Sequence, residues 1–390
     1  MEQIVCLSTS NFYPYPTRKQ NVMLRLPDAE ILYFDPPVSY IAPLKDKKAR
    51  ERLKKYRDPG ERAGEHITVY ALPPVLPFGQ KWRWINRLNQ RKLARYIRRR
   101  MRQHGYAKPL LWCYSPASAD IAAHLPHTRL VYDCVDRHSA YRGLLNPKLV
   151  DTLERELARR ADMVFCTAQG LYQTLKAYNP RTYLIPNGAD FDLFSQAAGD
   201  NPNHDPAHPV FGFVGMLQDC LAYDCLLALA DAYPKGEIRL IGRLMPGVDI
   251  AALRMRKNIR LLGLLPQSEL PRQMRDFDVC LNIFDPGKLS QDVSPLKFYE
   301  YLATGKPVVS TKEPRQVADY ADLIYIADSP GDFVAKCALA LAEADPEKTK
   351  GRLAAGLAAS WDNRVRQMVD KLREMAIFTQ QTEVIHEDHQ

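Results

Sequence analysis

The feature that most constrains the fold of this sequence is an alternation of two kinds of segment. Short apolar or β-branched runs alternate with helix-length amphipathic segments from one end of the chain to the other. Strands separated by helices usually pair in parallel, and a parallel sheet needs helices over both of its faces. The alternation therefore predicts an α/β fold in which helices cover parallel sheets.

The alternation occurs in two series, separated by "SQAAGDNPNHDPAHP" at residues 195–209. This stretch is small, polar and proline-containing and has no hydrophobic period, so we interpret it as a linker. At 390 residues the chain is also longer than one ordinary core supports. We therefore expect two doubly wound, Rossmann-like domains with a cleft between them and ligands at the carboxyl ends of the strands.

The sequence also gives bounds for these domains and strands. We expect an N-terminal domain at 1–194, a C-terminal domain at 210–358, a final helix at 359–378 and a tail at 379–390 that frays. The predicted strands are 4–8, 31–34, 67–72, 110–114, 130–132, 163–167 and 183–185 in the first series, and 210–214, 238–241, 259–262, 279–283, 307–310 and 323–326 in the second.

Composition excludes several classes of protein. Hydrophobic residues at 46% and charged residues at 25% are typical of a soluble globular protein. No apolar run approaches the roughly 18 residues that cross a bilayer, and the start of the chain does not resemble a signal peptide, so we expect a cytosolic protein. The 8 cysteines are scattered without a CxxC pair, which indicates buried thiols instead of disulfides or a zinc site.

Charge is distributed unevenly along the chain. Residues 1–190 contain 32 Lys and Arg against 17 Asp and Glu, a net charge of +15, which leaves −6 for residues 191–390. A basic first half favours an anionic partner, which is a phosphate, a nucleic acid or a membrane surface.

The stretch "SPLKFYEYLATGKPVVS", residues 294–310, predicts a helix followed by a buried strand. Ser294 and Pro295 suit a helix start, and Gly305 suits its end. Lys297 and Glu300 then lie one turn apart on the same face. Free amides and a lysine attract a diphosphate, and a carboxylate one turn further accepts hydrogen bonds from ribose hydroxyls.

The alternative for this pair is an ordinary ion pair on a solvated helix face, worth only about 0.2–0.5 kcal/mol. A lysine in the first turn opposes the helix dipole, which weighs against that alternative. The preceding loop "FDPGKLSQDV" directly follows a predicted strand, where doubly wound folds bind ligands. We therefore favour a nucleoside diphosphate site.

Glycine turns follow two further predicted strands. They contain Gly215 in "FVGML" and Gly242 with Arg243 in "LIGR", and they suit the approach of a phosphate to the backbone.

Two aspartate pairs raise the question of a metal site. Asp190 and Asp192 follow the "PNG" turn, and Asp276 and Asp278 precede a strand. Each pair brackets a phenylalanine, and we favour structural roles for both and predict no metal.

In the first half, "YDCVDRHSAY" places Asp133, Asp136 and His138 after a strand. Asp136 or His138 could orient an acceptor hydroxyl or accept its proton, although loop capping by Asp136 and simple exposure of His138 are equally consistent.

Residues 81–102, "KWRWINRLNQRKLARYIRRRMR", contain ten basic residues and no acidic one. As a helix, this segment places arginines along one side and apolar residues along another, a pattern typical of contact with an anionic membrane or an anionic acceptor. The alternative is a sheet-covering helix with a solvated polar face. The candidate surface residues are Trp82, Arg83, Trp84, Arg87, Arg91, Arg95 and Arg98, and the expected apolar stripe is Trp82, Ile85, Leu88, Leu93 and Tyr96.

Six motifs, "VYDCVDRHSAY", "YLIPNGADFDLF", "FVGML", "LIGR", "FDVCLNIF" and "SPLKFYEYLATGKPVV", occur in this order along nearly the whole chain. In order and separation they resemble the bacterial glycosyltransferases of family 4 and their family 1-like relatives, which have the GT-B fold and act in cell-surface polysaccharide biosynthesis. The resemblance implies an acceptor-binding N-terminal domain, a C-terminal domain that binds a nucleotide sugar, and a final helix that crosses back to the N-terminal domain.

The resemblance also implies roles for individual residues. Glu300 would hold the ribose, Asp292 would contact the donor sugar in place of the usual glutamate, and the backbone of Ser294, Pro295, Leu296 and Lys297 would face the diphosphate. Met216 occupies the position of an arginine found in many relatives. Arg243 and Lys297 would then neutralise the leaving group, without a metal or other cofactor and with retention of anomeric configuration.

These observations favour a glycosyltransferase that uses a UDP- or GDP-type sugar and builds a lipid-linked or cell-surface glycan at the inner face of the membrane. A nucleotide-sugar epimerase of the same fold is one alternative, and it would not need the basic helix. A nucleic-acid-binding protein is another, but no known binding motif accompanies the basic residues, so we expect no nucleic acid. An NAD-dependent dehydrogenase is disfavoured because no GxGxxG follows the first strand of either domain.

Overall fold

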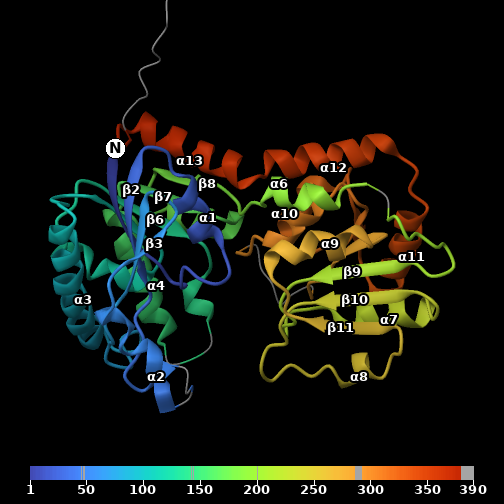
Figure 1. Ribbon diagram of the computed structural model, residues 1–390, viewed down its shortest axis with the longest axis horizontal. Helices are drawn as coiled ribbons and strands as arrows, with labels where there is room; N and C mark the ends of the chain where they lie inside the picture. The colour runs from blue at the N-terminus through green and yellow to red at the C-terminus, as the bar shows by residue number, and fades with distance from the viewer. Residues whose placement is uncertain are drawn as a thin grey trace, which may run out of the picture. The chain divides into compact units, whose positions relative to one another are not determined.

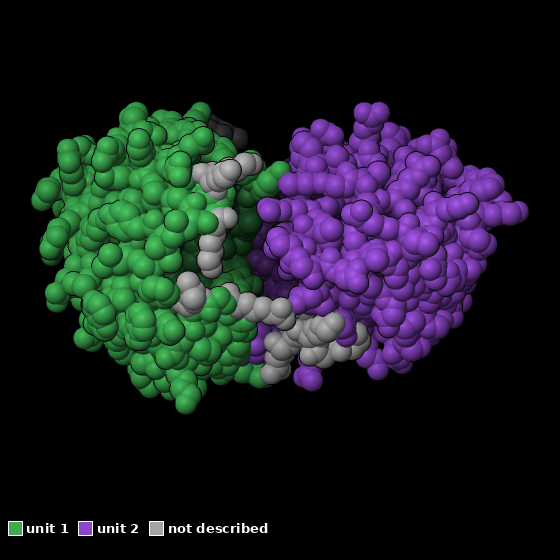
Figure 2. Space-filling view, turned by 90° about the horizontal axis from the view of Figure 1, so that it is seen from below, with its two compact units in different colours: residues 1–166, 172–185, 365–390 green, residues 167–171, 186–364 purple. Residues whose placement is uncertain are grey.

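The computed structural model describes residues 1–44, 46, 49–141, 143, 145–199, 201–285 and 292–378 (Figure 1). The predicted tail at 379–390 and most of the loop before residue 292 lie outside the described residues. The chain divides into two compact units (Figure 2). Unit 1 comprises residues 1–166, 172–185 and 365–390, and unit 2 comprises residues 167–171 and 186–364.

Unit 1 is built on a sheet with the strand order β3-β4-β2-β1-β5-β6-β7-β8. Strand pairs are parallel except for β3 with β4, which are antiparallel. All predicted strands of this half form close to their expected bounds, whereas the polar edge strand β3 was not predicted. The strands are β1 Glu2–Leu7, β2 Ala29–Asp35, β3 Glu61–Ala63, β4 Ile67–Ala71, β5 Leu110–Cys113, β6 Leu130–Cys134, β7 Met163–Cys166 and β8 Thr182–Leu184.

Helices cover both faces of this sheet. Apolar side chains of α1 and of the later turns of α13 share a buried cluster with Ile4 and Cys6 of β1. On the opposite face, the Tyr96 ring of α3 contacts Phe34 of β2, with ring centroids 6.4 Å apart. Glu154 of α4 accepts a 2.7 Å hydrogen bond from the hydroxyl of Tyr132 on β6. The helices are α1 Arg18–Arg25, α2 Ala49–Arg52, α3 Arg83–Gln103, α4 Pro147–Arg160, α5 Gln169–Lys176 and α13 Trp361–Glu374.

Unit 2 is built on a sheet with the order β11-β10-β9-β12-β13-β14, in which all strand pairs are parallel. The order reverses beside β9, since β10 lies on one side of it and β12 on the other. In doubly wound sheets, ligands bind outside the carboxyl ends of the strands at such a reversal. The strands are β9 Val210–Val214, β10 Glu237–Ile241, β11 Ile259–Gly263, β12 Val279–Asn282, β13 Val308–Thr311 and β14 Tyr325–Ala327.

Alternate residues of these strands meet two different sets of helices. Phe211 and Leu240 share a core with α7, α8 and α11, whereas Val214 and Cys280 share one with α6, α9 and α10. These two parallel sheets with helices on both faces confirm the predicted fold class. The helices are α6 Phe191–Phe194, α7 Tyr223–Ala232, α8 Ala251–Arg254, α9 Leu270–Arg275, α10 Leu296–Ala303, α11 Pro330–Leu341 and α12 Pro346–Ala358.

Short 3₁₀ helices complete the described structure. They are η1 Ala42–Leu44, η2 Lys55–Arg57, η3 Pro116–Ala119, η4 Ala122–His124, η5 His138–Ala140, η6 Ser195–Ala197, η7 Gln267–Glu269 and η8 Arg315–Tyr320. None of the helices within the described ranges is long and apolar enough to span a bilayer.

The buried stripe of α3 differs from the predicted one. Ile85 and Leu93 are buried as expected, but Trp82 and Leu88 are 45% and 46% exposed. Asn89 takes an interior position because its amide exchanges two hydrogen bonds with the backbone of Leu76, at 2.8 and 2.9 Å. A partly polar interior face therefore turns part of the predicted apolar stripe toward solvent.

Candidate functional site

The start of α10 lies beyond the carboxyl end of β12, close to the strand-order reversal of unit 2. The helix begins at Leu296, with Pro295 in the N-cap position and no side-chain cap. The prediction that Ser294 caps the helix is wrong, because the Ser294 hydroxyl accepts a 3.1 Å hydrogen bond from the backbone amide of Asn187. With no side chain on the first turn, its amides remain available to an anion.

Lys297 and Glu300 are brought together as predicted. The Lys297 Nζ atom lies 2.8 Å from Glu300 Oε2 and donates a 3.1 Å hydrogen bond to Oε1. The alternative of a solvated surface pair does not fit this geometry, because Glu300 is only 4% exposed. The Lys297 side chain is 32% exposed, so the pair joins a buried carboxylate to a cation that reaches the surface.

The electrostatics of Glu300 follow from this burial. Desolvation raises the pKa of the Glu300 carboxyl, the adjacent Lys297 charge opposes that rise, and Asp190 adds to it. Glu300 Oε2 is buried, and the Lys297 ammonium lies 2.8 Å from it without forming a hydrogen bond of good geometry. A hydroxyl group that reached this oxygen would therefore have to replace the lysine, and it could supply the hydrogen bond that the oxygen lacks.

Asn187 is a site residue that sequence reasoning did not single out. Its side-chain amide donates a 2.7 Å hydrogen bond to the backbone oxygen of Ser294, and its own backbone oxygen accepts one of 3.2 Å from Arg364. Its Oδ1 atom is buried and accepts no hydrogen bond from the described residues. The available signal was the "PNG" turn, since Gly188 has no room for a side chain: a Cβ there would lie 2.6 Å from the backbone oxygen of Ala359.

Tyr299 is a buried residue of α10 whose side chain contacts two other parts of unit 2. Its hydroxyl donates a 3.1 Å hydrogen bond to Gln316 Oε1, and the Arg364 guanidinium lies 5.6 Å from its ring centroid. Burial raises the pKa of Tyr299 to about 12, so it remains a neutral donor at physiological pH. These contacts fix the Tyr299 side chain of α10 without using the α10 amides.

The glycine turns lie at the carboxyl ends of β9 and β10, as predicted, but the structure gives Gly242 a packing reason. A Cβ on Gly242 would lie 1.7 Å from the backbone oxygen of Gly215. The two turns also pair with each other, since the Leu217 amide donates a 2.9 Å hydrogen bond to the backbone oxygen of Arg243. The Arg243 side chain is exposed, and Asp292 is 9% exposed.

Three of the four aspartates in these pairs make contacts of the structural kind that we favoured. Asp190 caps α6 by accepting a 3.2 Å hydrogen bond from the amide of Leu193. Asp278 accepts a 2.7 Å hydrogen bond from the amide of Val210, and Asp276 accepts one of 3.1 Å from Arg239. In the part of the chain that the structure describes, no group of three or more His, Cys, Asp and Glu side chains could hold a metal ion.

Of the three candidate residues of unit 1, Asp133 has a structural role, whereas Asp136 and His138 remain candidates for contact with an acceptor. Asp133 forms a buried ion pair with Arg18, 3.0 Å from its Nε atom, and is therefore structural. Asp136 accepts a 2.7 Å hydrogen bond from the hydroxyl of Tyr141. His138 is 8% exposed, contrary to the alternative of an exposed histidine, and its buried Nε2 has no partner among the described residues. Burial lowers the pKa of His138 to about 4, so the imidazole is neutral near pH 7.

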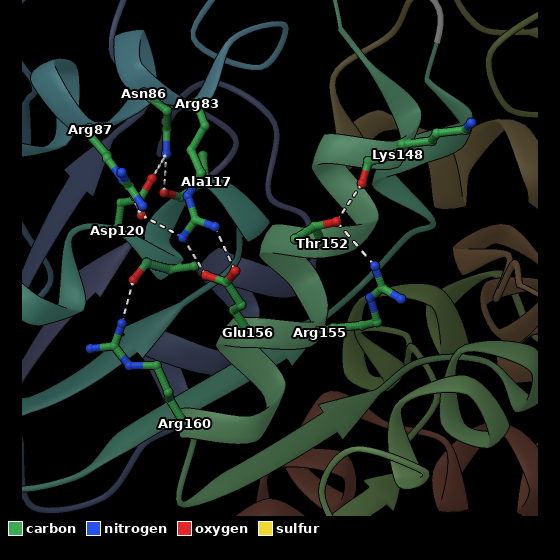
Figure 3. Close-up of polar contacts among 11 residues, drawn as sticks. Arg83, Asn86, Arg87, Ala117, Asp120, Lys148, Thr152, Arg155, Glu156 and Arg160 are labelled. Atoms are coloured by element: carbon green, nitrogen blue, oxygen red, sulfur yellow. Dashed lines mark hydrogen bonds and ion pairs between the residues drawn. The ribbon is translucent and has the colours of Figure 1, made fainter.

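The start of α3 belongs to a polar network with η3 and α4 (Figure 3). The Arg83 guanidinium donates a 2.6 Å hydrogen bond to Glu156 Oε1 and one of 3.0 Å to Asp120 Oδ1. Arg83 was predicted as a surface cation, and this assignment is wrong because two carboxylates from other elements hold it. Arg87 lies 3.9 Å from Asp120 Oδ1 and is 58% exposed.

The exposed face of α3 continues beyond this network. Residues spaced by three and four along the helix share one face. Trp84 is 63% exposed at the beginning of this face. The face combines two apolar side chains with a row of exposed arginines and consists of Trp84, Arg87, Leu88, Arg91, Arg95, Arg98, Arg99 and Arg102.

The two doubly wound units define the GT-B fold, and comparison with solved structures confirms it. The Anabaena protein HepE in complex with UDP and glucose matches with a TM-score of 0.59 and 15% identity over 96% of this chain and 99% of that one. The Escherichia coli structure titled "Trehalose-6-phosphate from E. coli bound with UDP-2-fluoro glucose" matches with a TM-score of 0.67 and 13% identity over the same shares of each chain.

Comparison at the level of sequence identifies a glycosyltransferase relative. The Bacillus subtilis (strain 168) protein named "Putative teichuronic acid biosynthesis glycosyltransferase TuaH" is 26% identical over 259 residues. The match covers 62% of this chain and 65% of the relative's length. No protein-family model matches the sequence. The resemblance expected from the motifs is therefore confirmed: this chain is similar to a glycosyltransferase in sequence and has the GT-B fold.

Proposed function

We propose that this protein is a glycosyltransferase that transfers a sugar from a nucleotide-diphosphate sugar to a lipid-linked or cell-surface glycan acceptor. The observation that carries the proposal is the buried carboxylate of Glu300, paired with Lys297 at the uncapped start of α10. This arrangement lies where a doubly wound sheet binds ligands. The sequence similarity to a glycosyltransferase supports the reaction class. The complexes of two solved neighbours with UDP and with UDP-2-fluoro glucose support a uridine nucleotide.

In the proposed complex, each part of the donor has a partner in unit 2. The diphosphate binds the backbone amides of Leu296 and Lys297, since Pro295 has no amide hydrogen to donate. The Lys297 ammonium turns from Glu300 toward the diphosphate, and ribose hydroxyls take its place on the carboxylate. Asp292 then faces the donor sugar, as the resemblance implies.

The transfer step requires stabilisation of negative charge on the departing diphosphate, because its transition state resembles an oxocarbenium ion. Lys297, Arg243 and the α10 amides supply that charge stabilisation without a metal or other cofactor. The resemblance implies retention of anomeric configuration. In unit 1, the neutral imidazole of His138 with its unpartnered Nε2 is suited to accept the acceptor's proton, and Asp136 is the alternative group.

Thermal-shift measurements with UDP, GDP and CMP sugars test the donor site. We expect a uridine nucleotide to raise the melting temperature, since a ligand that binds only the folded state stabilises it. The Lys297→Ala and Glu300→Ala variants should lose most of this shift. If both variants respond to the best nucleotide as fully as the parent protein, the donor does not bind at α10.

We also propose that the exposed face of α3 binds an anionic membrane surface. Its arginines approach lipid phosphates, and Trp84 and Leu88 suit the interface between headgroups and acyl chains. Sedimentation with vesicles that contain phosphatidylglycerol measures this contact. The triple variant Arg91→Gln, Arg95→Gln, Arg98→Gln should remain in the supernatant.

A second triple variant provides a control for loss of charge alone. Arg254, Lys257 and Arg272 are exposed residues of unit 2, and their replacement by Gln removes the same net charge. This variant should sediment like the parent. Equal sedimentation of both triple variants would contradict a membrane role for α3.

A further inference from the structure

Unit 1 contains a cavity of about 550 Å³, within the size range of small-molecule sites. It lies beyond the carboxyl ends of β1 and β4, against the first turns of α3. Its wall is largely apolar and includes Leu7, Leu72, Val75, Phe78, Leu93 and Ile121.

The polar side chains on the α3 wall of this cavity, Asn86, Asn89 and Gln90, form hydrogen bonds within the protein, and Gln90 donates one of 3.2 Å to Asn86 Oδ1. Asn86 donates a 3.1 Å hydrogen bond to the backbone oxygen of Ala117 and one of 2.8 Å to Asp120. Asn89 is bonded through both its amide nitrogen and its oxygen to the backbone of Leu76. A sugar needs several free hydrogen-bonding groups when it is buried, whereas a hydrocarbon chain needs none. This wall therefore favours an apolar ligand.

Large apolar side chains are exposed around the cavity. Leu76 and Tyr141 line it, yet they are 45% and 49% exposed. Trp82 is 45% exposed, and its ring centroid lies 5.4 Å from that of Phe78 in the cavity wall. Apolar groups gathered at an opening are typical of sites that receive a lipid or another apolar partner.

A buried cation lies near the same strand ends. Lys19 is 8% exposed, and its ammonium makes no hydrogen bond or close ion pair with the described residues. Burial lowers the pKa of Lys19, and the charges of Asp136 and Asp133 oppose that shift. Its Nζ atom lies 5.8 Å from the ring centroid of Tyr114, which directly precedes the cavity residue Ser115. His138 lines the cavity; burial is the main cause of its lowered pKa, Asp136 opposes the shift, and the nearby Lys19 charge adds to it. An anion in direct contact with the buried Lys19 ammonium would offset part of the cost of its burial.

We propose that this cavity binds the single hydrocarbon chain of a lipid phosphate, with the phosphate group at Lys19 and the chain against the apolar wall. One cavity receives one chain, and the cation complements the charge of the headgroup. The role of this lipid as the carrier of the glycan acceptor rests on the proposed function. The binding of the lipid does not.

The test uses geranylgeranyl phosphate, titrated into the full-length protein below its micelle concentration and followed by calorimetry. We expect saturable binding, and about 10- to 100-fold weaker binding of geranylgeraniol, which lacks the charged contact with Lys19. Lys19→Met should weaken the phosphate ester to the level of the alcohol. Lys108→Met removes an exposed lysine of the same unit and should leave binding unchanged.

A second variant tests the apolar wall. Ala42 lines the cavity and is half-buried, so Ala42→Trp fills space at the edge of the cavity without entering the core. It should abolish binding of both lipids while the variant keeps the cooperative urea-unfolding transition of the parent, which shows that it is folded. Absence of geranylgeranyl phosphate binding to the parent protein, or unchanged binding by Lys19→Met and Ala42→Trp, would overturn the proposal. Displacement by dioleoyl phosphatidate or glucose 1-phosphate at equal concentration would overturn the assignment to a single-chain lipid.

This assay contains neither nucleotide nor sugar transfer, so its outcome is independent of the donor site. A protein that binds UDP but not geranylgeranyl phosphate refutes the lipid cavity alone. A protein that binds the lipid but not any nucleotide refutes the proposed glycosyltransferase function alone.

Discussion

Replacement of Glu300 by glutamine tests the donor site with the smallest change of shape. The carboxylate is 4% exposed, and its charge is balanced by Lys297 at 2.8 Å. In the proposed complex, the lysine moves to the diphosphate and the carboxylate accepts hydrogen bonds from the ribose. Glutamine keeps one acceptor oxygen but loses the negative charge.

The magnitude follows from the difference between charged and neutral hydrogen bonds. A hydrogen bond to a charged group contributes about 1.5–3 kcal/mol and a neutral one about 0.5–1.5 kcal/mol. The exchange therefore costs about 1–2 kcal/mol of binding free energy, which is about a 5- to 30-fold increase in Kd. Removal of the acceptor altogether in Glu300→Ala should raise the Kd by about 10- to 150-fold.

Calorimetric titration with UDP and UDP-glucose measures these changes. Glu347 provides a matched control, because its carboxylate forms an ion pair with Lys350 at the same spacing but is 78% exposed. Glu347→Gln should leave the Kd unchanged. A Glu300→Gln variant that binds UDP as tightly as the parent, in a folded protein, would refute the assignment of the ribose to this carboxylate.

The stability of the same variant should depend on pH. Burial raises the pKa of Glu300 above its unfolded value, so the folded state binds more protons in the pH range just above the ordinary glutamate pKa. The contribution of Glu300 to stability is therefore largest at low pH and decreases as the pH rises through the folded pKa. Glu300→Gln lacks this decrease, so its free energy of unfolding relative to the parent should be higher at pH 7 than at pH 4.

Three further predictions concern stability, measured by urea denaturation. His138 has a folded pKa of about 4, below its unfolded value, so protonation favours the unfolded state. Between pH 7 and pH 5 the free energy of unfolding of the parent should therefore fall by about 2 kcal/mol more than that of His138→Gln. Parallel plots of unfolding free energy against pH would contradict a buried neutral imidazole. Gly242→Ala places a Cβ 1.7 Å from the backbone oxygen of Gly215 and should lower the free energy of unfolding by about 3 kcal/mol or more. Gly247→Ala has open space at φ +84° and should lower it by about 1–2 kcal/mol. Equal losses would contradict the packing of the Gly242 turn against the Gly215 turn. Arg83→Ala should cost about 1–3 kcal/mol because Glu156 loses its arginine partner and Asp120 loses one of its donors. Arg91→Ala should change stability by less than about 0.5 kcal/mol, and a neutral Arg83→Ala would contradict the network.

Much of the fold follows from local patterns in the sequence. The strand β9 forms over the predicted residues 210–214, because a continuous apolar run suits a strand buried on both faces. The edge strand β3, residues Glu61–Ala63, could not be predicted in this way. It is polar, three residues long, and held in register by β4 instead of by a hydrophobic pattern of its own.

The candidate site shows where sequence reasoning was sufficient and where it was not. The spacing of Lys297 and Glu300 was enough to place them together, since a helix of any kind brings such residues onto one face. The burial of Glu300 was not predictable, because it depends on the packing of α10 against α12 and α6. Ser294 suits a helix cap locally, but the distant Asn187 uses its hydroxyl instead.

The basic helix shows the same limit. Its lack of acidic residues was judged from that segment alone, whereas the acidic partners of Arg83 are Asp120, which follows η3, and Glu156 of α4. Buried Lys19 was not singled out because one lysine at a helix start carries no local signal. Only the fold shows that this side chain is buried, near the carboxylates of Asp136 and Asp133.

The central claim is that unit 2 binds a nucleotide sugar at the start of α10, and a crystal structure of the protein with UDP tests it most directly. We expect diphosphate oxygens within hydrogen-bonding distance of the amides of Leu296 and Lys297, and a ribose hydroxyl on the carboxylate of Glu300. UDP bound elsewhere, with the Lys297–Glu300 ion pair still closed, would contradict the claim.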